Sequence, residues 1–122
     1  MFMKEVGFYN DFNFVDKSFS GVISTASFYL YAVGLVKDKL GAKKLLELLE
    51  FPYGVSTCEY KEKESYLQWD YPLMWAPQMY FVYEALKASE LYEEAERIAT
   101  KYMQTVERNF DKTGILWENI MR

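Results

Sequence analysis

Apolar residues between positions 92 and 110 recur at spacings of three and four, and this periodicity constrains the fold more than any other feature of the sequence. The residues of this row are Ala95, Ile98, Ala99, Tyr102, Val106 and Phe110. Such spacing places side chains on one face of an α-helix, whereas a strand requires alternation with a period of two. The intervening positions are largely charged. We therefore predict a helix over 92–110 that buries one side.

Caps and helix-breaking residues indicate three further helices. The expected spans are from the Ser24-Thr25 cap to about Val36, then 39–50, and then 77–89. Pro52 and Gly54 end the second of these helices. The four helices are expected to form two antiparallel hairpins with little strand. The prediction is an all-α fold in a single domain over residues 1–122.

The stretch 51–76 joins the two hairpins and is expected to be mostly irregular. Connections of this length in compact domains are usually functional or disordered. Trp and Tyr rings stack on the faces of sugar rings, and Gln and Asp side chains bind hydroxyls, so a carbohydrate site is one interpretation. The residues alone favour a simpler interpretation, in which two Trp rings pack against the core and hold the loop in place. The string in question is Gln68-Trp69-Asp70-Tyr71-Pro72-Leu73-Met74-Trp75-Ala76-Pro77.

Oxygen-bearing side chains at two other places, Glu118 and the stretch 11–16, are further candidates for a functional site. Glu118 follows Trp117 just after a turn at Gly114, where a carboxylate could transfer protons, although an ordinary exposed Glu is the simpler interpretation. The stretch 11–16 carries Asp11, Asn13 and Asp16 but lacks the spacing of a calcium loop, so we expect a turn there.

Composition excludes several chemistries. The chain has no His, which removes imidazole bases, His metal ligands and Ser-His or Cys-His nucleophile pairs. The single Cys58 cannot form an internal disulfide or a Cys-based zinc site. A net charge of −4 argues against nucleic acid, which needs clustered Lys and Arg. We expect neither a metal nor a cofactor.

The sequence also argues against membrane insertion. The longest apolar run, 28–36, is much shorter than the roughly 20 residues that span a bilayer. The first residues lack the basic and apolar regions of a signal peptide. A soluble cytoplasmic protein is the expectation.

The string 68–77 closely resembles the second signature of the trehalase family, Gln-Trp-Asp-x-Pro-x-Gly-Trp-x-Pro. The resemblance extends in the family's order over roughly residues 24–119. Segments 28–32 and 84–86 resemble helical stretches of the family, and 53–57 resembles its Gly-Gly-(apolar)-x-Thr loop. Glu118 falls near the place of the family's catalytic Glu.

The resemblance implies an (α/α)6-toroid glycoside hydrolase that inverts configuration at an α-glucoside such as trehalose. In such enzymes one carboxylic acid protonates the glycosidic oxygen, and a second carboxylate about 6.5–9.5 Å away activates water. Carried over by position, Glu118 is the general base. The implied substrate-binding residues are Gln68, Trp69, Asp70, Trp75 and Thr57.

Several positions depart from the family pattern. Met74 replaces the signature Gly, so the loop backbone or the floor of the pocket must differ. Glu118-Asn119-Ile120 stands where the family has Glu-Lys-Tyr. The upstream Gly-Trp-Asp motif that carries the family's general acid is absent, as are the Gly-rich loop and the Gly-Trp-Thr segment expected after the base.

Length points to an incomplete arc of the toroid. Six helical hairpins need roughly 200 residues, more than the 122 present. We therefore expect a C-terminal portion of such an enzyme, for example a split or truncated gene product, and expect the isolated chain to be inactive. The alternative is a non-catalytic helical interaction or sugar-binding protein derived from that fold. Whichever holds, apolar side chains on the first and third helices, among them Phe28, Leu30, Tyr31, Phe81 and Tyr83, predict self-association or pairing with the remainder of the toroid.

Overall fold

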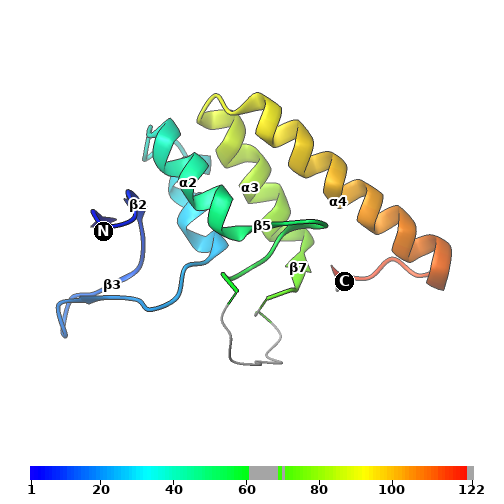
Figure 1. Ribbon diagram of the computed structural model, residues 1–122, viewed down its shortest axis with the longest axis horizontal. Coiled ribbons are helices and arrows are strands. Elements are labelled where there is room, and N and C mark those ends of the chain that lie inside the picture. The colour runs from blue at the N-terminus through cyan, green and yellow to red at the C-terminus, as the bar shows by residue number, and fades with distance from the viewer. Residues whose placement is uncertain (61–68, 70, 121–122) are drawn as a thin grey trace.

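The computed structural model describes residues 1–60, 69 and 71–120, and its described part is built around four α-helices (Figure 1). Helix α1 spans Phe28–Ala32, α2 spans Lys39–Leu49, α3 spans Ala76–Ala88 and α4 spans Tyr92–Thr113. A 3-10 turn, Thr25–Ser27, leads into α1. The prediction of four helices at these places is confirmed.

Helix α1 is shorter than the expected segment, which was to reach Val36. It ends at Ala32 because Gly34 adopts the left-handed conformation, with φ +74°. The backbone N–H of Gly34 then bonds the carbonyl of Tyr31 at 3.0 Å. Val33 and Leu35 lie exposed beyond this stop. The apolar residues continue past Ala32 to Val36, so no polar residue marks the end of α1 in the sequence.

Helix α2 agrees with its prediction to within one residue. The Asp38 side chain accepts a hydrogen bond from the backbone N–H of Gly41 at 3.0 Å, which caps the helix. Leu45, Leu46 and Leu49 are fully buried. Glu50 then turns into an extended conformation.

The described helices lie in two layers (Figure 1). Helix α1 packs on α3, with the rings of Tyr29 and Phe81 4.6 Å apart. One ion pair joins Lys43 of α2 to Glu94 of α4, and another joins Glu50, the residue directly after α2, to Arg97 of α4. The residue numbers rise together across these two pairs, so α2 and α4 run parallel.

The hydrophobic core lies between these layers. Phe8 from the N-terminal segment, Met74 and Ile120 also belong to it. Its main helical members are Phe28, Tyr31, Leu45, Leu46, Leu49, Val82, Leu86 and Ile98. No helix in the described ranges has the length and apolarity needed to cross a membrane.

Short strands border the helices, and the first twenty residues hold two hairpins that the sequence did not indicate. Strand β1 (Phe2–Met3) pairs with β2 (Phe8–Tyr9), and β3 (Phe12–Asn13) pairs with β4 (Ser18–Phe19). The expected turn at 11–16 lies in the second hairpin, where the Asn13 side chain accepts hydrogen bonds from two backbone N–H groups.

The stretch 51–76 is more ordered than predicted at both ends. Strands β5 (Glu50–Phe51) and β6 (Gly54–Val55) form a tight hairpin, hereafter the 50–55 hairpin. Pro52 therefore lies in the turn of a hairpin, where its fixed φ is favourable. At the other end β7 (Met74–Trp75) pairs with β8 (Asn119–Ile120). Residues 61–68 and 70 lie outside the described residues.

Candidate functional site

Thr57 lies at a junction of three segments. Its carbonyl accepts a hydrogen bond from the N–H of Thr25 at 2.9 Å, and its own N–H donates to the carbonyl of Leu73 at 3.1 Å. Its hydroxyl donates to the same Leu73 carbonyl at 3.2 Å. The buried Thr57 thus ties the beginning of α1 to the strand that precedes α3. Both helices begin at this junction, so they run parallel.

Trp75 is the last residue before α3 and lies buried in β7. The indole of Trp69 stacks on it with ring centroids 4.3 Å apart and planes at 21°. Trp69 remains 46% exposed, so this pair presents an aromatic face to solvent at the beginning of α3. Gln68 and Asp70, which were predicted to bind substrate beside it, lie outside the described residues.

The C-terminal segment returns to this aromatic pair. Helix α4 ends at Thr113, and the left-handed φ of +69° at the following Gly114 allows the chain to turn back. Strand β8 then pairs with β7 so that Asn119 lies opposite Trp75 and Ile120 opposite Met74. Glu118 immediately precedes this strand and is exposed. The fold therefore brings together the segments of Thr57, Trp75 and Glu118, which are far apart in the sequence.

Met74, the departure from the signature, is buried against a glycine. A Cβ atom on Gly54 would collide with the Sδ atom of Met74, and Gly54 has φ +154°. The absence of a side chain at position 54 therefore gives Met74 its place in the core. The sulfur atom of Met74 thus lies over the 50–55 hairpin, and the expected difference in the loop backbone or the pocket floor stays a prediction.

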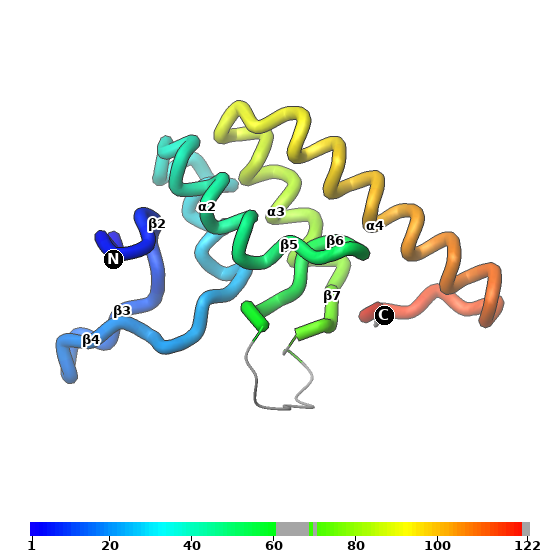
Figure 2. Tube along the Cα trace, viewed as in Figure 1, coloured from blue at the N-terminus to red at the C-terminus, as the bar shows by residue number. Residues whose placement is uncertain are grey.

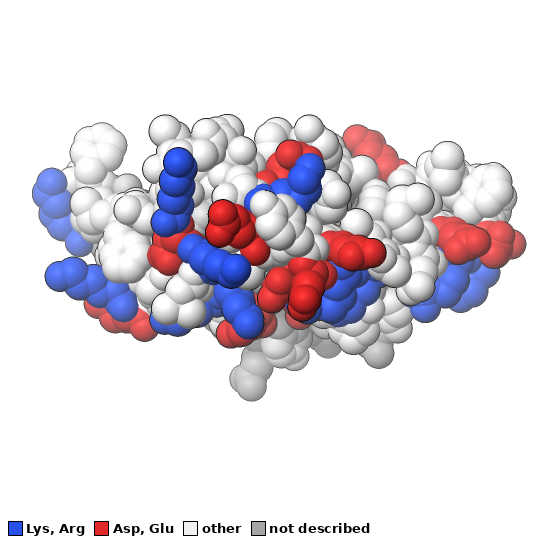
Figure 3. All heavy atoms as spheres, turned by 90° about the horizontal axis from the view of Figure 1, so that it is seen from above, with Lys and Arg blue, Asp and Glu red and all other residues white. Residues whose placement is uncertain are grey.

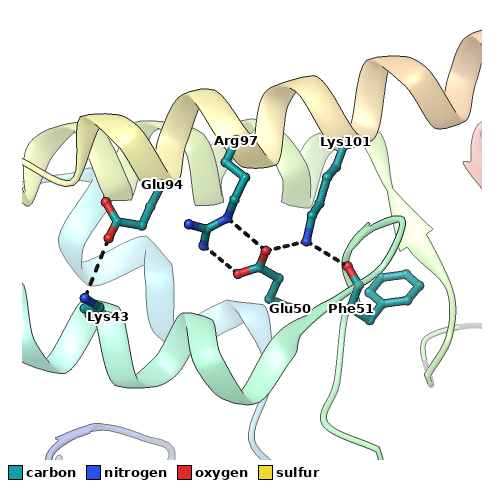
Figure 4. Close-up of polar contacts among 6 residues, drawn as sticks. All are labelled: Lys43, Glu50, Phe51, Glu94, Arg97 and Lys101. Atoms are coloured by element: carbon teal, nitrogen blue, oxygen red, sulfur yellow. Dashed lines mark hydrogen bonds and ion pairs between the residues drawn. The ribbon is translucent and has the colours of Figure 1, made fainter.

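A polar row on α4 holds the 50–55 hairpin, and sequence reasoning missed it (Figure 4). Arg97 donates to both carboxylate oxygens of Glu50, at 3.0 and 2.7 Å. Lys101 binds the same carboxylate and the carbonyl of Phe51. Such a bidentate, charge-assisted arrangement is among the stronger polar contacts in proteins.

The polar row continues one and two turns further along α4. The Thr105 hydroxyl lies within hydrogen-bonding distance of two carbonyl oxygens, that of Lys101 at 2.8 Å and that of Tyr53 at 3.1 Å. The Arg108 guanidinium lies 5.4 Å from the centre of the Tyr53 ring and donates to the Thr105 hydroxyl. We call Arg97, Lys101, Thr105 and Arg108 the α4 anchor row. The spacing of three to four between these polar residues was the signal in the sequence that could have revealed it.

The carboxylate of Glu50 is held in its ionised form. Burial alone acts to raise its pKa, but hydrogen bonds from Arg97 and Lys101 outweigh burial and lower the pKa below the ordinary value. The same contact with Glu50 raises the pKa of Arg97. The ion pair is therefore intact at neutral pH and connects α4 to the 50–55 hairpin, which lies against Met74.

Charges elsewhere on the surface are mixed. In the face seen in Figure 3, acidic and basic side chains alternate and do not gather into a patch of one sign. Within the part of the chain that is described, no group of three His, Cys, Asp or Glu side chains could hold a metal ion.

Comparison with known proteins gives one consistent result. The family model described as Trehalase matches residues 1–120. The chain is 30% identical to a cytosolic neutral trehalase of Beauveria bassiana over 97% of its own length, and 30% identical to that of Neurospora crassa over 94%. It spans only 17% of the length of each of these relatives.

A solved structure is similar as well. The neutral trehalase Nth1 from Saccharomyces cerevisiae superimposes with a TM-score of 0.85 at 27% identity, covering 98% of this chain and 24% of that one. The arrangement of helices and strands described above therefore occurs within a much longer trehalase chain.

Proposed function

The chain belongs to the trehalase family, and we propose that it supplies one side of the sugar site of an inverting glycoside hydrolase acting on an α-glucoside such as trehalose. The observation that carries this proposal is the pairing of β7 with β8, which sets Glu118 next to the strand that bears Trp75. A carboxylate beside an aromatic platform suits a reaction in which water attacks a bound sugar ring.

Glu118 is the general base in this proposal. Its exposed carboxylate accepts a proton from a water molecule, and that water forms a bond to the anomeric carbon as the bond to the leaving oxygen breaks on the opposite face. The general acid, which gives its proton to the leaving oxygen, comes from outside this chain. Separations of about 6.5–9.5 Å between the two carboxyl groups leave room for the water.

The aromatic pair binds the sugar in this proposal. The free face of Trp69 covers the apolar face of a glucose ring, while Trp75 holds Trp69 in place from below. Gln68 and Asp70 supply hydrogen bonds to hydroxyl groups. Thr57 already donates its hydroxyl hydrogen to Leu73, so its lone pairs are what it can offer to a sugar hydroxyl.

The arrangement of the helices supports an arc of an (α/α)6 toroid. Helices α1 and α3 form one layer and α2 and α4 the other, with parallel neighbours within each layer. Complete toroids need further hairpins, and the relatives are several times longer. We propose that the described helices form one third of such a ring, in a cytosolic protein like the named relatives.

A chimeric enzyme tests the role of Glu118. The matching segment of the Beauveria bassiana neutral trehalase is replaced by residues 1–120 of this chain, and glucose release from trehalose is measured. We expect an active chimera whose kcat falls about 10²–10⁴-fold with Glu118→Gln. Glu96→Gln, an exposed carboxylate on the outer face of α4, is the matched control. An active chimera that tolerates Glu118→Gln would overturn the assignment.

The isolated chain provides the complementary experiment. Without a general acid it should release no glucose from trehalose. If it hydrolyses trehalose, and Glu118→Gln abolishes the activity, the chain carries its own acid and the division of roles is wrong. A chain that binds trehalose and forms only inactive chimeras would favour the non-catalytic sugar-binding alternative.

A further inference from the structure

Several hydrogen bonds meet at the hydroxyl of Thr113, the last residue of α4. Its oxygen lies 2.8 Å from the carbonyl oxygen of Asn109 and 3.4 Å from that of Ile115, and the hydroxyl hydrogen serves the nearer of the two. The same oxygen accepts the backbone N–H of Ile115 and the indole N–H of Trp117, both at 3.2 Å. A hydroxyl has one hydrogen and two lone pairs, so these contacts use its full capacity.

The contacts with Thr113 hold the segment that turns back from α4. After Gly114 the chain leaves the helix and returns toward β7 (Figure 2). The side chains of Ile115, Leu116 and Trp117 are 51%, 71% and 52% exposed, so packing does little to fix the course of this segment. Among the described residues, the hydrogen bonds of residues 115–117 all go to the Thr113 hydroxyl.

Glu118 lies between two residues that are held in place. On its C-terminal side Asn119 pairs with Trp75 across β7 and β8. On its N-terminal side the indole of Trp117 is bound to Thr113. These two attachments limit the backbone motion of Glu118, whose side chain is exposed. A carboxylate that activates water must be held within about 0.5 Å of its working position, and such precision requires supporting residues.

We propose that Thr113 is a positioning residue, which sets the place of the Glu118 carboxylate through Trp117 without touching the sugar. This inference rests on the role of Glu118 proposed above, and it adds that the end of α4 orients the base. Thr113 is exposed, and a hydrogen bond to an exposed hydroxyl contributes little to global stability. Loss of the hydroxyl should therefore disturb the place of Glu118 much more than the folding of the chain.

Backbone relaxation of the ¹⁵N-labelled full chain tests the attachment. In the wild type the amides of Trp117 and Glu118 should have order parameters of about 0.85, as in rigid backbone. Thr113→Val removes the hydroxyl but keeps the branched shape, and it should lower these values toward about 0.6. Thr113→Ser keeps the hydroxyl and should retain the wild-type values. Thr100→Val, the same change at another exposed position of α4, is the matched control and should have no effect.

The chimera described above measures the catalytic consequence. Thr113→Val should lower kcat about three- to tenfold with little change in KM, since one hydrogen bond of this kind shifts an equilibrium by about that factor. Thr113→Ser and Thr100→Val should retain the activity. Trp117→Phe keeps an aromatic ring without the indole N–H, and it should lower kcat to a similar extent. Because both changes remove the same contact, the double variant should be about as active as Thr113→Val alone.

The Glu118→Gln background separates positioning from a general structural effect. Once the base is absent, Thr113→Val has no carboxylate left to position, so it should lower the remaining kcat no further. A merely structural role of Thr113 would cost the same factor in both backgrounds.

The inference is overturned if Thr113→Val keeps either the order parameters or the kcat of the wild type. It is also overturned if Thr113→Ser fails to retain them, or if the loss caused by Thr113→Val is undiminished in the Glu118→Gln background. Failure of the proposed function has a different result, because Glu118→Gln itself would then leave the chimera fully active.

Discussion

The two halves of α4 follow the same apolar periodicity but have different surroundings. In the first half Ala95 and Ile98 are buried against the core, and the α4 anchor row begins beside them. In the second half Val106 is only partly covered and Phe110 is about half exposed. Periodicity indicates which face of a helix is apolar. Whether another element covers that face depends on the rest of the fold.

The largest expected loss of stability comes from truncating a buried side chain in the first half of α4. Ile98→Ala should lower the free energy of unfolding by about 2–5 kcal/mol, because Ile98 has no exposed area and its loss leaves a cavity. Urea denaturation followed by circular dichroism measures the change. Leu45→Ala, equally buried on α2, is the matched control and should cost a similar amount. A small loss for Ile98→Ala alone would mean that α4 packs loosely along its whole length.

The second largest loss of stability is expected from a substitution in the 50–55 hairpin, which lies beside the first half of α4. Gly54→Ala should destabilise the chain by about 1–3 kcal/mol, because the new Cβ strains a positive φ and displaces the buried Met74 sulfur. Combined with Met74→Ala it should cost less than the sum of the two separate changes. Strict additivity would show that the two residues do not share one space. Gly21→Ala meets no neighbour within 4 Å and serves as the control.

Breaking the ion pair should have a smaller effect. Glu50→Gln removes the charged partner of Arg97 and Lys101, and the loss should be about 1–2 kcal/mol at neutral pH, since these cations are partly exposed. Lys87 and Glu84 form a comparable ion pair on an exposed face, and Glu84→Gln should cost much less. Equal effects of the two substitutions would remove any special role for the α4 anchor row.

The pH dependence of the Glu50 contribution has a defined sign. The pKa of Glu50 is lower in the folded chain than its ordinary value of 4.5. The contribution is therefore complete above that ordinary pKa and is lost as the pH falls through the lower folded pKa. The difference in stability between wild type and Glu50→Gln should stay constant above about pH 6 and shrink below about pH 4.5. A difference that grows on acidification would contradict this sign.

The second half of α4 should give the smallest effect on stability. Phe110→Ala should lower the free energy of unfolding of the monomer by only about 1 kcal/mol, because Phe110 is 47% exposed. Unfolding at low concentration, where copies of the chain are separate, is the measurement. A loss comparable with that of Ile98→Ala would show that this half is covered after all.

Helices with clear caps and breaks could be predicted closely from sequence. Pro77 in the first turn of α3 and the charged face of α4 gave local signals, whereas the cap that Asp38 forms on α2 emerged only from the structure. The end of α1 was missed because Gly34 follows an unbroken apolar run. The N-terminal hairpins were missed because two-residue strands are too short to show alternation.

The candidate site was only partly accessible from sequence. The aromatic string could be recognised from its order of residues, and the fold brings the segments of Thr57, Trp75 and Glu118 together. The pairing of β7 with β8 is a contact between distant segments, and nothing local to residue 119 or 120 predicts it. The packing of Met74 against Gly54 and the ion pair between Arg97 and Glu50 are also contacts between distant segments, so local sequence does not predict them.

The central claim is that Trp69 and Trp75 form the sugar-binding face of this chain, and the indole signals of ¹⁵N-labelled protein test it most directly. The chain has three Trp residues, so three indole N–H signals can be followed as trehalose is added. The signals of Trp69 and Trp75 should shift in a saturable way, while that of Trp117, whose indole N–H donates to Thr113, should stay in place. Trp69→Ala should abolish the shift of Trp75, and an equal concentration of glycerol should cause none. If trehalose moves the Trp117 signal alone, or leaves all three unchanged at concentrations where trehalases are saturated, the proposed sugar site is wrong.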